Sequence, residues 1–326
     1  MDSSSIKEPI LSHLDSVELL LNEEIPEDIR MSFDIIKHLI LRPGKRLRPS
    51  IVLLSALSLK KKMNKKILSA AASVELLHNA SLIHDDIVDQ AKIRRGLKSV
   101  NKIWGDHASV LVGDFLLARS LFLINKCQNN KVMASVTNAA SELANGQILD
   151  IMISKRLISF NKDIYFKMIK LKTASLVSSS AEVGGLLSTQ DPNKLKGLRQ
   201  YGTNLGISYQ LVDDALDLLG DAKQMGKNTM EDIKEGKVTL PILIALDATS
   251  TRKRSKITKI LIEKDFDRKN LDILYNFVLE NNAVEETLKL ANKYSSKAIL
   301  AIESLSKSKY KDSLIALARE NIVRVS

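Results

Sequence analysis

The spacing of apolar residues is the feature that most constrains this chain, because over most of its length they recur at intervals of three and four. Such spacing places them along one face of an α-helix. The pattern predicts helices over residues 10–41 (interrupted at Pro26), 50–59, 67–89, 106–127, 131–154, 162–187 and 191–219, with further amphipathic helices in most of the C-terminal part. Helix breakers are scarce, with 13 Gly and 6 Pro in 326 residues, and aromatic strand formers make up only 4%. The sequence therefore predicts an all-α helical bundle that forms a single domain over residues 1–326.

The chain is strongly basic, with a formal net charge of +11. Positive charge of this size is typical of proteins that meet phosphate, as nucleic acid, a membrane surface or a phosphorylated substrate. A blander interpretation stays open, in which most of the excess Lys residues are solvated surface. The most basic run, LKKKMNKK at Leu59–Lys66, has no interleaved aromatics and is typical of a loop between helices. We therefore expect no nucleic-acid partner.

The chain has one cysteine, Cys127, so it forms no intrachain disulfide, which favours a reducing compartment. The N-terminal stretch MDSSSIKEPI is polar and has no apolar core of the kind that secretory signals carry. The longest purely apolar runs are far shorter than the ~18 residues that indicate a membrane span. We expect a cytoplasmic protein with no stable membrane insertion.

An acidic motif follows the apolar end of one predicted helix, in the stretch LIHDDIVDQAKIRRG (Leu82–Gly96). Asp85 and Asp89 stand four residues apart, which places them on one helix face, one turn from each other. Like charges at this spacing repel, and a hard divalent cation bound between them reverses the sign of that interaction. Mg²⁺ prefers a few carboxylates together with water and substrate phosphates. A solvated acidic helix surface explains a single motif of this kind equally well.

A second copy of the motif favours the metal interpretation. The stretch QLVDDALDLLGD repeats the spacing with Asp213, Asp214 and Asp217, again directly after apolar residues on a predicted helix. Two such helices facing each other would form two acidic walls, which would bind an anion only with several Mg²⁺ ions between them. This arrangement is similar to the metal clamps that neutralise a departing phosphate.

Two groups of basic residues suit a diphosphate. Lys45, Arg46 and Arg48 lie on the turn GKRLRP, and Arg94 and Arg95 follow the first motif. Guanidinium groups donate two hydrogen bonds to one phosphate, and Lys supplies a point charge. Any single Lys in so basic a chain is as readily a surface residue. Gly and Pro fix the backbone of the GKRLRP turn, which favours a site there.

These motifs together resemble the trans-prenyl diphosphate synthases. The resemblance rests on GKRLRP, HDDIVDQAKIRRG, Lys172-Thr173, YQLVDDALD and GKN…EGKVTLP, which follow one another in order from about residue 40 to 245. It implies an all-α isoprenoid synthase fold with a deep central cavity, usually a homodimer. It also implies the consecutive condensation of isopentenyl diphosphate with an allylic diphosphate.

The resemblance assigns roles by position. It implies three Mg²⁺ ions, and the metal ligands it implies are Asp85, Asp86, Asp89, Asp213, Asp214 and Asp217. The residues it implies for isopentenyl diphosphate are Lys45, Arg48, His78 and Arg95. Those it implies for the allylic diphosphate are Arg94, Lys172, Thr173, Gln210, Lys227 and Lys237. Within this set we expect the catalytic residues to be Asp85, Asp89, Asp213 and Lys172. No protein general base is expected, because in the family the released diphosphate takes the final proton.

Position along the helix supports one of these roles independently. His78 lies seven residues before Asp85, two helical turns away on the same face, which favours a site residue over a core histidine.

Product length is predicted from the two residues four and five positions before Asp85, which by the resemblance set the floor of the tail cavity. Here they are Ser81 and Ala80, both small, where family members with short products carry an aromatic residue. Small residues imply a product of C20 or longer. The stretch NGQILDI (Asn145–Ile151) is more similar to members that make short or C20 products, so a geranylgeranyl diphosphate synthase stopping at C20 remains an alternative.

Two other classes share part of the pattern. Terpene cyclases have the fold and the first acidic motif, but their second metal motif mixes Asn, Ser and Glu, whereas the second motif here is intact. Non-catalytic subunits of heteromeric synthases tend to lose aspartates, and none is lost here. Both are therefore less favoured than an active synthase.

Overall fold

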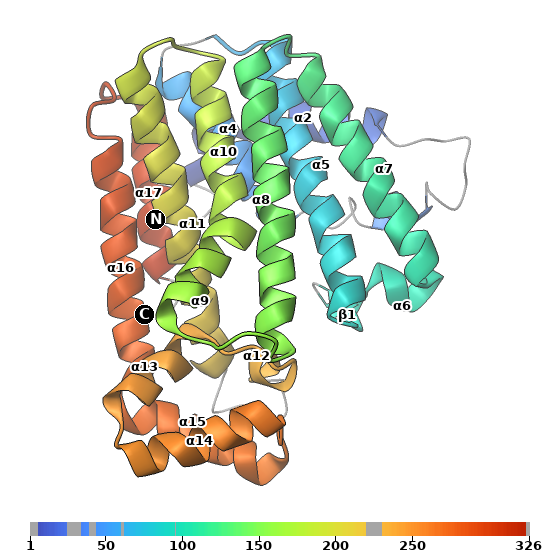
Figure 1. Cartoon of the computed structure of the whole chain (residues 1–326). Coiled ribbons are helices and arrows are strands. Elements are labelled where there is room, and N and C mark those ends of the chain that lie inside the picture. Colours follow the sequence, from blue (N-terminus) through green and yellow to red (C-terminus); the bar gives the residue numbers. More distant parts are fainter. Residues whose placement is uncertain are drawn as a thin grey trace. The chain divides into compact units, whose positions relative to one another are not determined.

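The computed structural model describes residues 6–24, 34–38, 44–59, 62–94, 96–219 and 230–323. Apart from one short hairpin, the regular structure of these residues is helical, which confirms the all-α prediction (Figure 1). The N-terminal elements are η1 (Glu8–Ile10), α2 (Leu11–Glu23), α4 (Leu47–Ser58), α5 (Lys65–Val88), α6 (Val100–Trp104), α7 (Asp106–Asn125) and α8 (Asn130–Ser154). The C-terminal elements are α9 (Lys162–Ile169), η2 (Lys170–Ala174), α10 (Ser175–Leu186), α11 (Pro192–Leu219), α12 (Glu231–Lys234), α13 (Leu240–Ala248), α14 (Thr251–Glu263), α15 (Arg268–Glu280), α16 (Ala283–Ala301) and α17 (Lys309–Val323). The hairpin pairs β1 (Ile93–Arg94) with β2 (Leu97–Lys98) in antiparallel fashion.

The chain divides into two compact units. Unit 1 comprises Met1–Ser141, Leu176–Gly202 and Ala301–Leu317, and unit 2 comprises Glu142–Ser175, Thr203–Leu300 and Ala318–Ser326. The first acidic motif belongs to unit 1 and the second to unit 2, so each motif is described within its own unit. The expectations of a single domain and of a deep central cavity stay predictions.

Unit 1 is organised around α5, which packs against α2, α4 and α7. Its contact with α7 is close because small residues meet there. The Ser73 hydroxyl donates to the Ser120 carbonyl, and the Ser120 hydroxyl donates to the Ser73 carbonyl, both at 2.9 Å. A Cβ added at Gly113 of α7 would lie 2.2 Å from Nε2 of His84. Small residues on both helices therefore let α7 lie close to α5, the helix that carries the first acidic motif.

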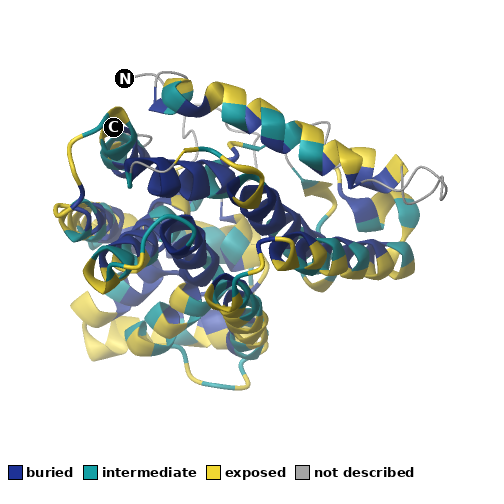
Figure 2. Cartoon of the chain, turned by 90° about the horizontal axis from the view of Figure 1, so that it is seen from above, coloured by how far each residue is buried: buried dark blue, intermediate teal, exposed yellow. Residues whose placement is uncertain are grey.

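Unit 2 has a core to which α11 and α13 contribute many of the buried residues. Leu211, Val212, Ala215 and Leu218 of α11 are buried next to the second acidic motif. The helix α13 is apolar on nearly all sides and mostly buried. Figure 2 shows that buried residues occupy one face of most helices and exposed residues the other. Each acidic motif thus sits at a boundary between a buried and an accessible helix face.

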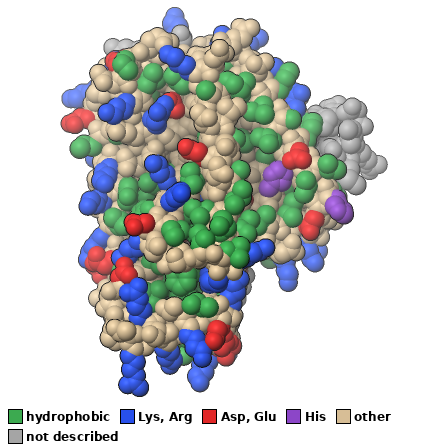
Figure 3. All heavy atoms as spheres, viewed as in Figure 1, with side chains coloured by type: hydrophobic (Ala, Val, Ile, Leu, Met, Phe, Trp, Pro, Cys, Tyr) green, Lys and Arg blue, Asp and Glu red, His purple; other side chains and the backbone are tan. Residues whose placement is uncertain are grey.

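Within the described ranges, one helix is long and apolar enough to cross a membrane by length and composition alone, namely α7. This is weak evidence for a span, because core helices meet the same two criteria. Charged side chains, with Lys and Arg prominent among them, are distributed over the face seen in Figure 3.

Candidate functional site

The first acidic motif lies at the C-terminal end of α5. The helix begins where the Asn64 side chain accepts a hydrogen bond from the Ile67 amide at 3.1 Å. It ends at Val88, and the amide of the next residue, Asp89, donates to the Asp85 carbonyl at 2.8 Å. Asp85 and Asp89 are half-buried, whereas Asp86 between them is only 2% exposed. The helical period therefore turns two carboxylates toward an accessible face and the third into the protein.

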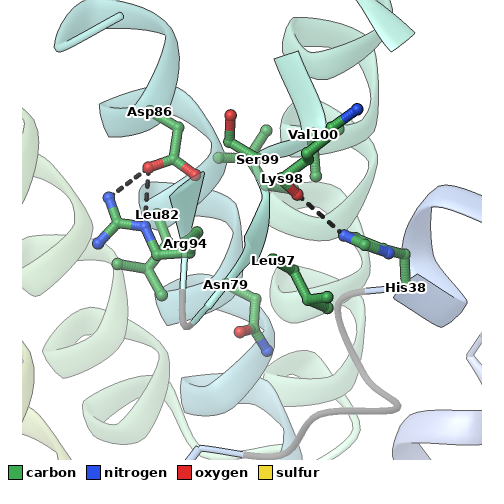
Figure 4. A pocket seen from close by; sticks show the side chains of 10 residues that line it. His38, Asn79, Leu82, Asp86, Arg94, Leu97, Lys98, Ser99 and Val100 are labelled. Carbon is green, nitrogen blue, oxygen red and sulfur yellow. Dashed lines mark hydrogen bonds and ion pairs between the residues drawn. The ribbon is translucent and has the colours of Figure 1, made fainter. Parts of the chain in front are cut away.

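The buried Asp86 is paired with Arg94 of the β1–β2 hairpin (Figure 4). Its carboxylate accepts from Nε of Arg94 at 2.8 Å and from Nη2 of the same guanidinium. Burial disfavours the charge on Arg94, but hydrogen bonding to Asp86 and the charges of Asp85 and Asp89 outweigh it and raise the pKa of Arg94. Asp86 thus holds a cation beside the two other aspartates, and its predicted role as a metal ligand stays a prediction.

A small pocket of about 30 Å³ lies beside this ion pair (Figure 4). The hairpin lines it with Leu97, and α5 lines it with Asn79, a residue that the sequence did not single out. Asn79 is buried, and within the described part of the chain its Nδ2 has no hydrogen-bond partner. An unsatisfied buried amide donor is costly, so Asn79 offers a hydrogen bond to a group that enters the pocket.

The three cations of the basic turn GKRLRP lie in two different environments. Arg46 has a positive φ of 47° and is buried. Its guanidinium donates to Glu75 at 2.7 Å and to Glu18 at 2.9 Å. Lys45 is exposed and Arg48 half-buried, which suits the predicted diphosphate contacts. Arg46 is instead held by two carboxylates, so it anchors the turn that presents its neighbours.

The remaining sequence-predicted residues of unit 1 lie further back on α5. His78 is half-buried, and its carbonyl accepts from the Ser81 hydroxyl at 2.8 Å. Ala80 is 2% exposed and Ser81 half-buried. His84, which received no predicted role, lies 3.5 Å from an Asp114 carboxylate oxygen of α7. Arg95 lies outside the described residues, and the roles of His78, Ala80 and Ser81 stay predictions.

The second acidic motif lies near the end of α11 in unit 2. Asp191 caps this helix, and its carboxylate accepts from the Asn193 amide at 2.9 Å. Asp213 is exposed, Asp214 buried and Asp217 half-buried. The Asp217 carboxylate accepts from the Glu231 amide at 3.0 Å, at the start of α12. Burial raises the pKa of Asp217 even though hydrogen bonds from the Glu231 and Asp232 amides lower it.

The buried Asp214 is held by neutral donors. Tyr165 of α9 donates its hydroxyl proton to one carboxylate oxygen, and Nε2 of Gln210 donates to the other at 2.8 Å. The Thr173 hydroxyl in turn donates to Oε1 of Gln210 at 2.8 Å. Burial raises the pKa of Asp214, and burial together with the charge of Asp214 raises that of Asp232. Burial and crowding thus disfavour the ionised form of these two carboxyls, and a bound cation would favour it.

A pocket of about 70 Å³ in unit 2 collects several predicted residues. These are Lys172, Gln210, Asp214 and Lys237. It also contains residues that the sequence analysis did not assign: Asp150, Tyr165, Asp232 and Thr239. Lys237 pairs with Glu235 at 2.6 Å and lies 3.8 Å from an Asp232 oxygen. Lys227 lies outside the described residues.

Lys172 is positioned by a local departure from α-helical geometry. It lies in η2, a π-helical turn of a kind often found at functional sites. Gly146 of α8 lies against this turn so closely that a Cβ there would come within 2.3 Å of the Lys172 amide. The Lys172 ammonium donates to the Asp150 carboxylate at 2.6 Å. Gly146 and Asp150 both belong to the stretch NGQILDI. The sequence analysis used this stretch only to predict product length, whereas the structure shows that it positions Lys172.

The donor atoms of both motifs fit a hard divalent cation. All are carboxylate oxygens, which Mg²⁺ and Ca²⁺ prefer over the nitrogen and sulfur ligands typical of zinc. Within the described ranges, no three His, Cys, Asp or Glu side chains converge as a ready-made metal site. Mg²⁺ usually takes one or two carboxylates and completes its shell with water and substrate phosphate, a mode that Asp85 with Asp89, and Asp213, can support.

Residues 30–278 match the polyprenyl synthetase family. The chain is 37% identical over 331 residues to a prenyl transferase of Cyanidium caldarium, covering 98% of this chain and 97% of the relative. It is 32% identical over 324 residues to the octaprenyl diphosphate synthase of Escherichia coli, covering 99% of each. It is 34% identical over 296 residues to the geranylgeranyl diphosphate synthase of Saccharolobus solfataricus, covering 87% of each.

Solved structures agree with this assignment. A decaprenyl diphosphate synthase from Rhodobacter capsulatus superposes with a TM-score of 0.94 at 31% identity, covering 100% of both chains. A polyprenyl synthase from Caulobacter crescentus, complexed with calcium and isoprenyl diphosphate, gives a TM-score of 0.92 at 32% identity and covers 100% of this chain and 98% of that one. The order of motifs, the all-α fold and these similarities agree, and the chain belongs to the polyprenyl synthetase family of prenyltransferases.

Proposed function

We propose that this prenyltransferase extends an allylic diphosphate with isopentenyl diphosphate, in a Mg²⁺-dependent reaction, to a product of C20 or longer. The observation that carries the proposal is that both acidic motifs are complete and that each has a carboxylate-held cation in its own unit. Arg94 is held by Asp86 in unit 1, and Lys172 is held by Asp150 in unit 2. Preorganised charges of this kind stabilise a departing diphosphate better than mobile surface side chains do.

The basic residues of unit 1 suit the binding of one diphosphate. Lys45 is accessible, Arg48 and His78 are half-buried, and Arg46 anchors the turn from behind. In unit 2, Lys172 and Lys237 can neutralise phosphate oxygens, while Thr173 orients the Gln210 side chain. Three Mg²⁺ ions, held by Asp85, Asp89 and Asp213 with the help of their neighbours, would neutralise the leaving diphosphate. Exclusion of water would protect the allylic carbocation from hydrolysis.

The condensation itself tests the proposal. Purified protein is incubated with Mg²⁺, labelled isopentenyl diphosphate and each allylic primer in turn, and the products are sized by chromatography. We expect consecutive condensation and a product of C20 or longer. If no primer supports condensation, the chain is not an active synthase and the non-catalytic subunit becomes the better interpretation. A product that ends at C15 would refute the prediction drawn from Ala80 and Ser81.

Product length has a sharper test in Ala80→Phe. Ala80 is 2% exposed, and under the proposal a phenyl ring there would occupy space that the growing tail needs. We expect the main product to shorten by one or more isoprene units, while consumption of the allylic primer continues. Ser81→Phe on the adjacent, half-buried position serves as the matched comparison. If product length is unchanged in both variants, the floor of the tail cavity is formed by other residues. The C20 alternative would then be decided by the size of the wild-type product alone.

The assembly and location of the protein are further parts of the proposal. By similarity we infer a homodimer, which light scattering on the purified protein would test. We also propose a cytoplasmic location, which the single cysteine favours, and fractionation of the source cells would test it.

A further inference from the structure

Two segments of unit 2 concentrate most of the net charge of the chain. Residues 155–162 and 243–264 contain nine Lys and Arg residues but only two acidic residues, Asp247 and Glu263. They thus carry +7 of the formal +11 in less than a tenth of the sequence. We call the surface formed by these two segments the basic face.

The helix α14 forms the larger part of the basic face. Its inward side is apolar, with Ile257, Ile260 and Leu261 buried. Its other sides expose Arg252, Lys253, Arg254, Lys256 and Lys259. In Figure 3, Lys and Arg side chains gather over the region that Figure 1 shows as α14 and α15. This helix is therefore amphipathic, and its exposed charged residues are cationic except for Glu263.

Several of these cations have acidic neighbours, but others do not. Asp247 lies 2.8 Å from Lys162 and 3.8 Å from Arg254, and Lys253 pairs with Glu280. Among the described residues, no ion pair involves Lys155, Arg252 or Lys256. The charge of the basic face is thus only partly compensated, and its excess is available to an anionic partner.

Exposed aliphatic side chains lie among the cations. Leu157 is 67% exposed and Ile262 is 54% exposed, and both line a groove of about 490 Å³. The groove walls include Leu246 and Phe160, and Arg254 lies at the same groove. Water-exposed Leu and Ile at the edge of a concave surface are the side chains that gain most from entering an apolar phase.

The position of Leu157 is fixed by the residue before it. Arg156 has a positive φ of 60°, and its guanidinium donates to the Gly236 carbonyl at 2.7 Å and to the Leu261 carbonyl at 2.8 Å. These bonds tie the 155–162 segment to the C-terminal end of α14. The segment is therefore held with Leu157 outward, next to Ile262, rather than free to fold inward.

We propose that the basic face docks on an anionic lipid bilayer. Lys and Arg would meet the phosphates of the headgroups, while Leu157 and Ile262 would enter the boundary between headgroups and acyl chains, as in interfacial amphipathic helices. Nucleic acid fits less well, because single strands are bound by exposed aromatic side chains and this face presents aliphatic ones. The docking is peripheral and requires no membrane-spanning segment. It also does not depend on catalysis.

Vesicle sedimentation tests the proposal directly. The full-length protein is mixed with phosphatidylcholine vesicles, with or without phosphatidylglycerol, at low and at high salt. We expect binding only to the anionic vesicles and a steep loss at high salt. The triple variant Lys155→Gln, Arg252→Gln, Lys256→Gln should partition less by about fivefold for each charge removed. Leu157→Ser with Ile262→Ser should weaken binding to the same vesicles without changing its salt dependence.

The matched control removes the same net charge elsewhere. Lys289, Lys293 and Lys297 of α16 are exposed and lie outside the basic face, and Gln at all three should leave partitioning within about twofold of wild type. Thermal unfolding confirms that each variant is folded. Equal loss in the control, equal binding to neutral vesicles, no binding at all, or tighter binding to RNA than to anionic vesicles would each overturn the proposal.

Discussion

The two acidic motifs share one spacing but differ in how their buried aspartate is compensated. In the first, Asp86 faces the guanidinium of Arg94, so a negative and a positive charge are buried together. In the second, Asp214 faces Tyr165 and Gln210, which donate hydrogen bonds but carry no charge. Asp232, also acidic, lies close enough that burial and the charge of Asp214 raise its pKa to about 8. The buried carboxylate of the first motif is therefore balanced by a cation, whereas that of the second has neutral side-chain donors and would be stabilised by a bound cation.

The largest expected effect concerns the accessible aspartates, and here we expect the same loss of activity at both motifs. We expect Asp85→Asn and Asp213→Asn each to lower kcat by about 10²–10³-fold, because each removes charge that stabilises the leaving diphosphate through bound metal. Steady-state condensation at saturating primer measures this. Asp191→Asn, at the capped start of α11, serves as the control and should keep its activity. A loss at only one of the two motifs would show that the other is not part of the catalytic site.

Replacing the buried aspartate of each motif should change the stability of the protein in opposite directions. Asp86→Asn leaves the Arg94 guanidinium without its anion, and we expect the free energy of unfolding to fall by about 1–3 kcal/mol. Asp214→Asn removes a buried charge that has only neutral donors, and we expect the free energy of unfolding to stay the same or to rise by about 1 kcal/mol. Chemical denaturation at neutral pH without added metal compares the two variants. If both variants are destabilised equally, the contrast between the motifs does not hold.

The sequence predicted the helices of both motifs, and the burial of the second aspartate in each could also have been predicted from it. Asp86 lies three residues after the buried Ile83, and Asp214 lies three residues after the buried Leu211, so the helical period alone turns both inward. Their partners were not predictable in the same way. Arg94 reaches Asp86 through a hairpin where no strand was expected, and Tyr165 lies 49 residues from Asp214. Local periodicity encodes which way a side chain points, whereas tertiary contact decides what it meets.

The π-helical turn at Lys172 illustrates the same limit. The apolar pattern over residues 162–187 predicted one continuous helix, but the structure divides it into α9, η2 and α10. The close approach of Gly146 lies outside that window, and no local signal in the segment marks the change. The role of Arg46 was likewise hidden, because a cation in a phosphate-binding turn and a cation buried by Glu18 and Glu75 have the same sequence signature.

Stability as a function of pH sharpens the comparison further. Burial raises the pKa of Asp214 and Asp232, so the folded state binds their protons more tightly than the unfolded state does. This contribution favours folding below the unfolded value of about 4 and is lost as the pH rises through the folded pKa values. We therefore expect Asp232→Asn to gain stability relative to wild type as the pH is raised from about 4, in metal-free buffer.

Denaturation at several pH values measures that difference, and Asp191→Asn provides a control of opposite sign. Backbone hydrogen bonds from Lys194 and Asn193 lower the pKa of Asp191, so its contribution is present above the unfolded pKa and is lost as the pH falls. Added Mg²⁺ should stabilise wild type more at the higher pH values, because the metal binds ionised carboxylates. A Mg²⁺ effect that does not change with pH would argue against a cation at the second motif.

The smallest expected effect concerns the neutral donor that distinguishes the second motif. Tyr165→Phe removes the hydroxyl that donates to Asp214 while keeping the ring packed against Phe166 and the core. We expect the free energy of unfolding to fall by about 1 kcal/mol at neutral pH, because the buried carboxylate loses one of its hydrogen bonds. In acid, where Asp214 is protonated, the cost should be smaller. The loss in stability could come from the lost hydrogen bond or from altered packing of the ring, and the double variant Tyr165→Phe with Asp214→Asn distinguishes these causes. If Tyr165→Phe still costs stability when Asp214 is Asn, the cause is packing of the ring rather than its hydrogen bond to Asp214.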